Sequence, residues 1–528
     1  MDSNRLKLFL YTIKYLKPIQ FYYRILYFLR NKFLKKKNKK NIHLNHNSIF
    51  WKNGFNFENS FNESKKIFTF LNQSYFYKKN INWNNNDYGN LWSYNLNYFD
   101  FLNQKKIKKR TGLNLIYNFI ENNIKLTYAK DPYPISLRSI NWIKFLSIYN
   151  IKEKNIDLIL LDHYFILENN LEYHLLGNHL LENAFSLLFG SYYFQNHNMY
   201  LKSKKLLLKQ LNEQILEDGG HYELSPMYHQ ILFSRLLDCI QLIQLNPNWK
   251  RDELKTFLSI KAQKMNAWLK NITYNNGDIP MVNDSTYNVA PKSQTLFKYF
   301  KKLGLNEINN SLLESGYRKI NFSKYELFID VGNIGPDYQP GHSHSDTFNF
   351  EIHVNNLPVL VDTGISTYEN NSIRQSQRKT ESHNTVMISN SEQSEVWQSF
   401  RVARRAKISK LIECDNFISA SHNGYSKIKF KHNRSFKWSA NNIEILDSLN
   451  KSSDHKARAF FHFHSSISKP IIKNGNVILK EIGVSLKFKG HTKIIVSKYN
   501  LSMGFNKTKN AYKLTVVFDK SLLSKIVL

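Results

Sequence analysis

The sequence predicts a two-domain α+β protein, in which a helical N-terminal half is followed by an antiparallel β-sandwich. Its 528 residues exceed what one hydrophobic core usually organises. Apolar residues recur at steps of three and four in the first half, which is the period of an amphipathic helix. After about Asn321 they recur at steps of two, which is the period of a strand. We place the boundary within 305–325 and assign domains to 46–315 and 316–528.

Several amphipathic segments make up the helical half. Polar or Gly/Pro-containing links separate them, so we expect antiparallel helix hairpins that are stacked or closed into a ring. Ahead of one segment, Ser225 is predicted to cap a helix, and Pro226 suits its first turn. The clearest segments are LNLIYNFIENNI, SLRSINWIKFLSIY, NHLLENAFSLLFGSYYF and MYHQILFSRLLDCIQLIQL.

The β half shows alternation with short Gly, Asn and Ser turns and no interleaved helical pattern. In TFNFEIHV the four apolar residues share one face, and the other face carries Thr347, Asn349, Glu351 and His353. NNIEILDSL, VSLKFKG, KIIVSKY and AYKLTVVF continue this pattern. Strands of this kind favour an antiparallel sandwich, and the cleft between two such halves is a usual place for a ligand.

Residues 1–45 form a basic amphipathic segment. Its apolar residues recur at helical spacing from Leu6 to Ile13, and a basic run follows at Lys35–Lys40. Two interpretations stay open: a helix packed on its own protein with a solvated basic end, or peripheral contact with an anionic membrane surface. No signal peptide or uncharged stretch of transmembrane length is recognised, so we expect a cytoplasmic, membrane-peripheral protein, with the periplasm as the alternative.

Composition restricts the class of partner. The formal net charge is +33, which favours nucleic acid, anionic lipid or acidic polysaccharide. No helix-turn-helix, zinc-finger or RNA-binding signature is present, so we do not expect a nucleic-acid partner. The two cysteines, Cys239 and Cys414, lie far apart in the sequence, which disfavours a disulfide framework.

A histidine pair marks the start of the β half. His342 and His344 are two residues apart in PGHSHSD, so in an extended chain they point the same way. With Asp362 and His383 they offer the donor types of a zinc site, although solvated surface histidines have the same pattern. A simple hairpin around 355–356 would not place Asp362 opposite His344, so a metal site here requires a bend or bulge.

Candidate catalytic residues in the helical half lie near two helix starts. Asn178 could be a helix cap, and Glu182 could orient His179 or solvate the face that they share. His221 and Tyr228 flank the start of another helix, whose positive end could lower the pKa of a tyrosine. The alternative is that Tyr228 is one of 31 tyrosines and packs in a core.

Eight phrases in order, over about residues 90–410, resemble the heparinase II/III family of polysaccharide lyases. This resemblance implies an incomplete α/α toroid followed by an antiparallel β-sandwich. It also implies β-elimination at a uronic acid, with an acidic polysaccharide in the cleft. The phrases are LWSYNLNYFDFL, YPISLRSINWIKFL, GNHLLENAFSLLFG, DGGHYELSPMYH, GDIPMVNDS, PGHSHSDTFNFE, PVLVDTGISTY and SHNTVMI followed by QSEVWQSFRVARRA.

The resemblance also implies residue roles. Asn178, helped by His179, would neutralise the substrate carboxylate, His342 would take the C5 proton, and Tyr228 would protonate the leaving oxygen, with a base role open to Tyr228 as well. Zinc would be held in a structural role by His344, Asp362 and His383. The candidate substrate-binding residues are Arg138, Glu182, His221, Tyr368, Arg374 and Arg378.

The opening segment is more similar to the branch of this family associated with bacterial capsule and exopolysaccharide synthesis than to its exported members. The expected substrate is therefore a bacterial surface polysaccharide that contains uronic acid. A catalytically weak or inactive polysaccharide-binding or assembly factor is the alternative, because retained residues do not guarantee turnover.

Overall fold

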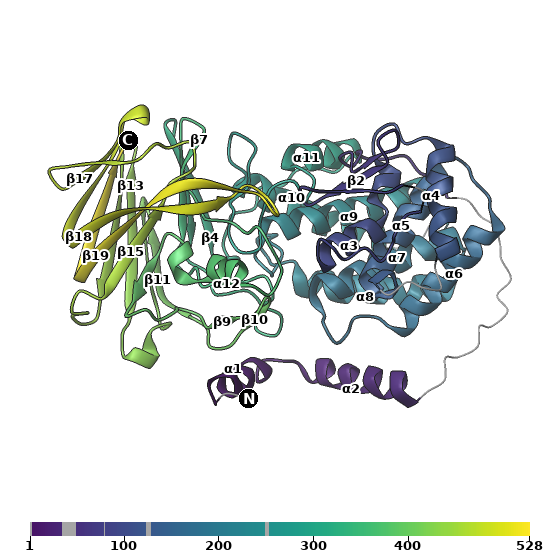
Figure 1. Cartoon of the computed structure of the whole chain (residues 1–528), viewed down its shortest axis with the longest axis horizontal. Coiled ribbons are helices and arrows are strands. Elements are labelled where there is room, and N and C mark those ends of the chain that lie inside the picture. Colours follow the sequence, from purple (N-terminus) through teal and green to yellow (C-terminus); the bar gives the residue numbers. More distant parts are fainter. Residues whose placement is uncertain (1–2, 34–48, 79, 123–127, 249–252) are drawn as a thin grey trace.

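The computed structural model describes residues 3–33, 49–78, 80–122, 128–248 and 253–528, and shows a helical domain beside a β domain (Figure 1). The predicted basic run Lys35–Lys40 lies outside the described residues. Helices up to Lys302 and strands from Tyr317 confirm the predicted order of a helical half and a β half. No helix among the described residues is both long and apolar enough to cross a bilayer.

The helical domain consists of long helices and a small three-stranded sheet, β1 (Phe61–Asn62), β2 (Ile67–Phe70) and β3 (Gln73–Phe76). Short 3-10 turns, such as Asp100–Asn103 after the first of these helices, complete the links. The helices are α3 (Asn90–Tyr98), α4 (Lys109–Asn122), α5 (Pro132–Ile148), α6 (Lys154–Asn169), α7 (Gly177–Tyr193), α8 (His197–Gln214), α9 (Pro226–Leu245), α10 (Leu254–Ile272) and α11 (Ser293–Lys302).

Burial separates inner from outer helices. Most residues of α5, α7 and α9 are buried, whereas α4, α8 and α10 each bury one face. A helix that is buried on most of its sides lies inside its domain, so these three form the inner layer. Trp142 in α5 is fully buried between Phe99 and Phe119, at ring-centroid distances of 5.5 and 5.7 Å.

The β domain contains a four-stranded sheet, a ten-stranded sheet and the β9–β10 ribbon. All strand pairs in them are antiparallel. The strands are β4 (Tyr317–Asn321), β5 (Tyr325–Asp330), β6 (Phe350–Val354), β7 (Leu357–Leu360), β8 (Val386–Ile388), β9 (Val396–Trp397), β10 (Arg401–Val402), β11 (Ile408–Cys414), β12 (Phe417–His422), β13 (His432–Ser439), β14 (Asn442–Leu449), β15 (Ala457–His462), β16 (Ile471–Lys473), β17 (Asn476–Leu479), β18 (Val484–Ser502) and β19 (Thr508–Val527).

The long β18–β19 hairpin extends across the β domain. β19 pairs with β14 through its C-terminal part and with β15 through its N-terminal part. Register shifts between Lys489 and Lys493 let the hairpin bend. The apolar faces of the four- and ten-stranded sheets share one core, in which Phe350 packs against Phe436 and Phe461.

One predicted strand begins later than its alternation indicates. The pattern in TFNFEIHV starts at Thr347, but β6 begins at Phe350. Phe348 has φ of 69°, a left-handed conformation that ends an extended chain, and the amide of Asn349 donates to the carbonyl of Asp346 in a turn. The sequence PGHSHSD is therefore a loop whose side chains are placed by tertiary contacts.

The turn after β6 contains the irregularity that the spacing required. Asn355 and Asn356 have φ of 50° and 64°, which suits a two-residue hairpin turn. The register of β6 on β7 shifts between Ile352 and His353. A bulge of this kind re-aims the residues that follow, and Asp362 comes two residues after β7.

The polar face of β6 packs against the helical domain. Tyr274, just after α10, donates its hydroxyl to Glu351 at 2.9 Å and stacks on His353 with a centroid distance of 3.7 Å. The amide of Met281 donates to the other oxygen of Glu351 at 2.9 Å. Glu351 and His353 are both buried, so this alternating face is an interface between the domains.

We predict that Tyr274→Phe lowers the free energy of unfolding by about 1–3 kcal/mol, because it removes a hydrogen bond from a buried carboxylate. Calorimetric melting of the purified protein measures the change. Tyr22→Phe is the control, since Tyr22 is 60% exposed. Equal melting temperatures for the two variants would contradict this role for Tyr274.

Candidate functional site

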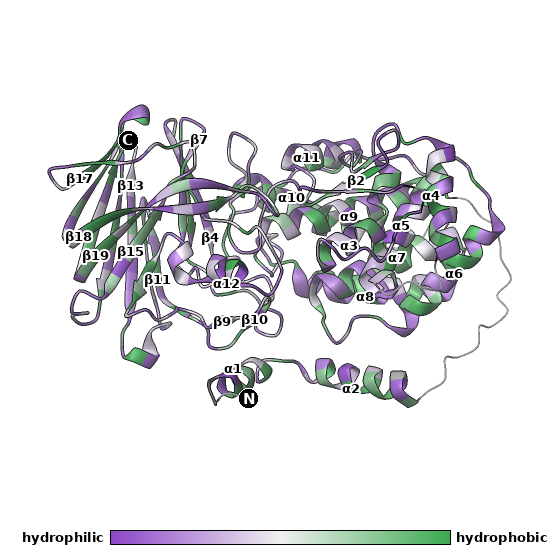
Figure 2. Cartoon of the chain, in the orientation of Figure 1, coloured by the Kyte–Doolittle hydropathy of each residue, from purple (hydrophilic) through white to green (hydrophobic). Residues whose placement is uncertain are grey.

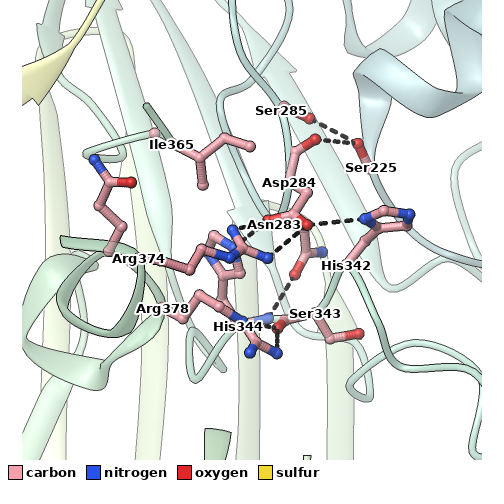
Figure 3. Close-up of polar contacts among 12 residues, drawn as sticks. Ser225, Asn283, Asp284, Ser285, His342, Ser343, His344, Ile365, Arg374 and Arg378 are labelled. Atoms are coloured by element: carbon pink, nitrogen blue, oxygen red, sulfur yellow. Dashed lines mark hydrogen bonds and ion pairs between the residues drawn. The ribbon is translucent and has the colours of Figure 1, made fainter. Parts of the chain in front are cut away.

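A buried carboxylate, Asp284, lies at the centre of the site (Figure 3). One of its oxygens is 2.8 Å from His342 Nδ1, and the other is 2.9 Å from His344 Nε2. Both oxygens also accept from Arg374, with one bond of 2.7 Å. Burial by itself would raise the pKa of Asp284, but Arg374 and the two imidazoles hold it well below its usual value.

The segment that carries Asp284 also contacts the start of α9. Ser225 accepts from the amide of Tyr228 at 3.3 Å, as its predicted cap role requires, and donates its hydroxyl to the backbone carbonyl of Asp284 at 2.9 Å. Asn283, with φ of 54°, donates to the carbonyl of Leu224 at 2.9 Å. These bonds fix the first turn of α9 against the loop that holds the histidines.

His342 and Tyr228 lie face to face across the domain boundary. Their rings stack with a centroid distance of 3.9 Å and an interplanar angle of 28°. His342 is buried and Tyr228 is partly exposed. The contact of Nδ1 with the Asp284 carboxylate favours a proton on that nitrogen. Nε2 lies 3.3 Å from Glu223 Oε2 and is the ring nitrogen left to exchange a proton with a substrate.

The phenol of Tyr228 is held in its protonated form. Tyr368 donates its hydroxyl to Tyr228 at 3.2 Å. Burial raises the pKa of Tyr228 well above its usual value, and this effect exceeds the opposing effect of the Tyr368 hydrogen bond. This direction differs from the lowering that a helix N-terminus could cause, and it suits a proton donor.

Asn178 reaches the same point from α7. Its side-chain Nδ2 lies 3.4 Å from His342 Nε2 and donates to both oxygens of Glu223, at 3.0 and 3.2 Å. It is not the helix cap, because Leu176, with φ of 65°, precedes the first helical residue, Gly177. The structure therefore brings together Asn178, Tyr228 and His342, three of the four predicted catalytic residues.

The fourth, His179, points elsewhere. Its Nδ1 lies 3.0 Å from Glu172, and its ring lies beside Tyr133 at 4.7 Å. Burial opposes the charged form of His179, yet Glu172 leaves its pKa raised. Glu182 does not orient it: this fully buried carboxylate faces Arg235 at 3.6 Å, and burial raises its pKa to about 7. The three-residue spacing of His179 and Glu182 did not predict this pairing, because the partner of His179 is Glu172 in the loop before α7.

The predicted substrate-binding residues have mixed positions. Tyr368 lies at the site, whereas the guanidinium of Arg138 donates to backbone carbonyls inside the helical domain. His221 is fully buried and its Nε2 lies 3.0 Å from Gln214. From α12 (Ser372–Arg378), Arg374 pairs with Asp284 and Arg378 donates to the carbonyl of Ser343 at 2.9 Å. Arg374 and Arg378 therefore support the site through contacts with the protein and do not face a substrate.

A pocket of about 510 Å³ opens beside the catalytic side chains. Asn90, Leu91 and Tyr94 line it from α3, and Tyr368 and Phe400 line it from the β domain. Phe400 lies 6.2 Å from the ring of His342, and exposed Arg401 lies at the rim. Aromatic rings and a cation are suited to holding acidic sugars, and this pocket is the candidate substrate groove.

The predicted zinc residues lie behind His342. His344 and His383 are fully buried with centroids 5.3 Å apart, and their nitrogens Nδ1 and Nε2, respectively, have no partner among the described residues. Asp362 lies 2.7 Å from His383 Nδ1, the ring nitrogen opposite the unpartnered Nε2. No group of three possible ligands in the described chain is arranged to hold a metal ion. The donor types fit zinc, and in this arrangement Asp362 pairs with His383 Nδ1 and accepts a hydrogen bond from Asn349.

Sequence reasoning missed two residues of this site. Asp284 lies in the phrase GDIPMVNDS and Glu223 in DGGHYELSPMYH, but neither is in the predicted set. A carboxylate in an irregular segment resembles any surface Asp or Glu. The available signal was the presence of an acidic residue within each matched phrase.

Two family models match the chain. The model described as Heparinase II/III N-terminus matches residues 138–303, and the model described as Heparinase II/III-like, C-terminal matches residues 306–520. A curated relative, heparin-sulfate lyase from Bacteroides stercoris, is 24% identical over 245 residues. That alignment covers 40% of this chain and 36% of the relative.

Solved structures share the fold of this chain. A crystal structure of heparinase III has a TM-score of 0.65 at 16% identity, with 97% of this chain and 92% of that chain covered. Heparan sulfate lyase HepC from Pedobacter heparinus has a TM-score of 0.56 at 15% identity, with 88% and 81% covered. The likeness confirms the predicted toroid followed by a β-sandwich. With both halves matched in order, this chain belongs to the heparinase II/III family.

Proposed function

We propose that this protein is a polysaccharide lyase that cleaves a uronic-acid-containing polysaccharide by β-elimination. The observation that carries the proposal is the meeting of an imidazole, a phenol and an amide at one point between the domains. His342 Nε2 lies 3.4 Å from Asn178 Nδ2, and the His342 ring stacks on Tyr228 at 3.9 Å. This set supplies a base, an acid and a neutral donor for a carboxylate.

The proton transfers follow from the protonation states of His342 and Tyr228. His342 Nε2 takes the proton from C5, and the electrons of that bond form the C4–C5 double bond as the C4–O bond breaks. The departing oxygen takes its proton from Tyr228, whose raised pKa keeps that proton available at neutral pH. Asp284 stabilises the imidazolium that forms on His342.

The substrate carboxylate must be neutralised because negative charge develops beside it. The amide of Asn178 lies 3.4 Å from His342 Nε2, and it turns from Glu223 to the carboxylate when substrate binds. Arg401 at the pocket rim and the net charge of +33 support an acidic polymer as substrate. A bacterial surface polysaccharide matches this chemistry.

We predict that the protein releases an unsaturated product from at least one uronic-acid polymer in a panel. The C4–C5 double bond conjugated with the carboxylate absorbs in the ultraviolet, whereas the intact polymer does not. His342→Ala and Tyr228→Phe each lower the rate about 10²–10⁴-fold, because each removes a proton-transfer group. His197→Ala, at an exposed position on α8, is the control.

Binding of a polymer to the protein without the ultraviolet absorbance of an unsaturated product would contradict the lyase proposal. If every polymer that binds to the protein stays uncleaved, the protein is a polysaccharide-binding or assembly factor. The near-complete burial of Asn178 and His342, at 2% and 8% exposure, is the observation that favours this second function.

We predict that Asp284→Asn lowers kcat about 10²–10⁴-fold, because the amide no longer holds the required tautomer of His342. It also leaves Arg374 unpaired, which costs about 3–5 kcal/mol of stability. Asp447→Asn is a matched control: Asp447 is fully buried, lies 2.7 Å from His432 and accepts two bonds from Arg434. We expect the folded Asp447→Asn variant to retain its kcat, so equal losses of kcat would remove the special role of Asp284.

We also propose a structural zinc ion held by His344, Asp362 and His383. Bound zinc would order the loops behind His342, since elimination needs no hydrolytic water. The two buried, unpartnered imidazole nitrogens support this proposal.

Elemental analysis of purified protein tests the zinc proposal. We predict that wild type contains zinc and that His344→Ala loses it, while His432→Ala, which removes a buried histidine elsewhere in the β domain, keeps it. Equal zinc content in wild type and His344→Ala would exclude His344 as a ligand.

A further inference from the structure

Two N-terminal helices, α1 (Ser3–Ile13) and α2 (Pro18–Phe33), form an arm along the edge of the molecule (Figure 1). α1 contacts the β domain. Thr12 accepts from Trp397 Nε1 at 3.0 Å and donates to the carbonyl of Val402 at 3.4 Å. The guanidinium of Arg405 lies over the ring of Tyr15 at 3.8 Å.

α2 contacts the helical domain mainly through polar and aromatic side chains. Gln20 donates to the carbonyl of Leu175 at 3.3 Å, and Tyr27 donates its hydroxyl to the carbonyl of Leu171 at 2.5 Å. Tyr23 stacks on Tyr173 at 4.4 Å. The loop before α7 therefore receives hydrogen bonds from the arm, and the arm spans both domains.

The face of α2 that does not contact the protein is apolar. Its exposed residues recur at helical spacing and are 41–67% exposed: Phe21, Tyr22, Ile25, Phe28, Leu29 and Phe33. Leu6 and Leu10 on α1 are 46% and 51% exposed. A helix on a soluble domain normally buries its apolar stripe and exposes its polar one. Both kinds of residue are visible along the arm in Figure 2.

The arm is also strongly basic. Residues 3–33 contain no Asp or Glu but seven cations: Arg5, Lys7, Lys14, Lys17, Arg24, Arg30 and Lys32. Of these, Arg5, Lys7, Lys14, Arg24 and Lys32 are exposed. The amino-acid sequence continues with KKKNKK at 35–40.

The exposed apolar residues and the basic charge of the arm together limit the kinds of partner that it can bind. A second copy of this chain carries the same charge of +33, so pairing two arms would bring like charges together. An acidic polysaccharide would pair with the cations but leave the apolar stripe in water. An anionic lipid surface accepts both, since its headgroups pair with Lys and Arg while rings and aliphatic side chains enter the acyl boundary.

We propose that the outer face of α1 and α2 docks on an anionic membrane surface. This inference does not depend on catalysis. The arm also lies close to the pocket residue Arg401, which is adjacent in sequence to Val402, the residue that Thr12 contacts.

Vesicle flotation of the full chain, without polysaccharide, tests the proposal. We expect binding to phosphatidylcholine vesicles that contain phosphatidylglycerol, and little binding to phosphatidylcholine alone. The double variant Phe28→Ser/Phe33→Ser should bind roughly tenfold or more weakly, because two rings no longer leave water. Lys14→Gln/Lys32→Gln should weaken binding to the anionic vesicles and reduce its dependence on salt.

The matched control is Leu313→Ser/Leu357→Ser, which removes two residues that are 66% and 56% exposed outside the arm. It should bind like wild type, and melting temperatures should show that every variant is folded. Wild type that stays unbound, or a Phe28→Ser/Phe33→Ser variant that binds unchanged, would overturn the proposal. A wild-type dimer in sedimentation velocity that this variant dissociates would instead identify an interface between two copies.

Discussion

The buried carboxylate of Asp284 is the constraint on which the site depends. Its oxygens meet Arg374, His342 and His344 from the β domain, and its backbone carbonyl accepts a hydrogen bond from Ser225 at the start of α9. A buried charge is tolerated only when it is paired and hydrogen-bonded. Any movement that separated the histidine loop from α9 would break this pairing, so the relative position of His342 and Tyr228 is maintained by electrostatics.

A second buried cluster of a carboxylate, a guanidinium and an imidazole occurs in the β domain, away from the substrate pocket. Asp447 pairs with Arg434 and His432 inside the β domain, where every member is fully buried or nearly so. A carboxylate, a guanidinium and an imidazole therefore make a stable unit but not a site. What distinguishes the Asp284 cluster is its position at the domain boundary, where one ring nitrogen of its histidine faces Asn178 and a pocket opens beside it.

Polar contacts outside this cluster also join the two domains. Glu351 in β6 receives hydrogen bonds from Tyr274 and Met281, and the N-terminal arm contacts the β domain through Thr12 and the helical domain through Gln20. Such contacts are directional, so they set the orientation of the cleft walls more strictly than apolar burial would. The apolar residues of the arm are left outside, on the face that we propose docks on a membrane.

The sequence by itself determined the order of a helical and a β domain, the cap at Ser225 and the residue types of the site, because hydrophobic period and capping chemistry are local properties. Eight short phrases were enough to indicate the family. Only the tertiary structure decided that Glu172 rather than Glu182 partners His179, that Arg374 serves Asp284 rather than a substrate, and that His342 stacks on Tyr228. Those pairings join residues up to 114 positions apart, and no local rule relates side chains that meet only when two domains close on one another.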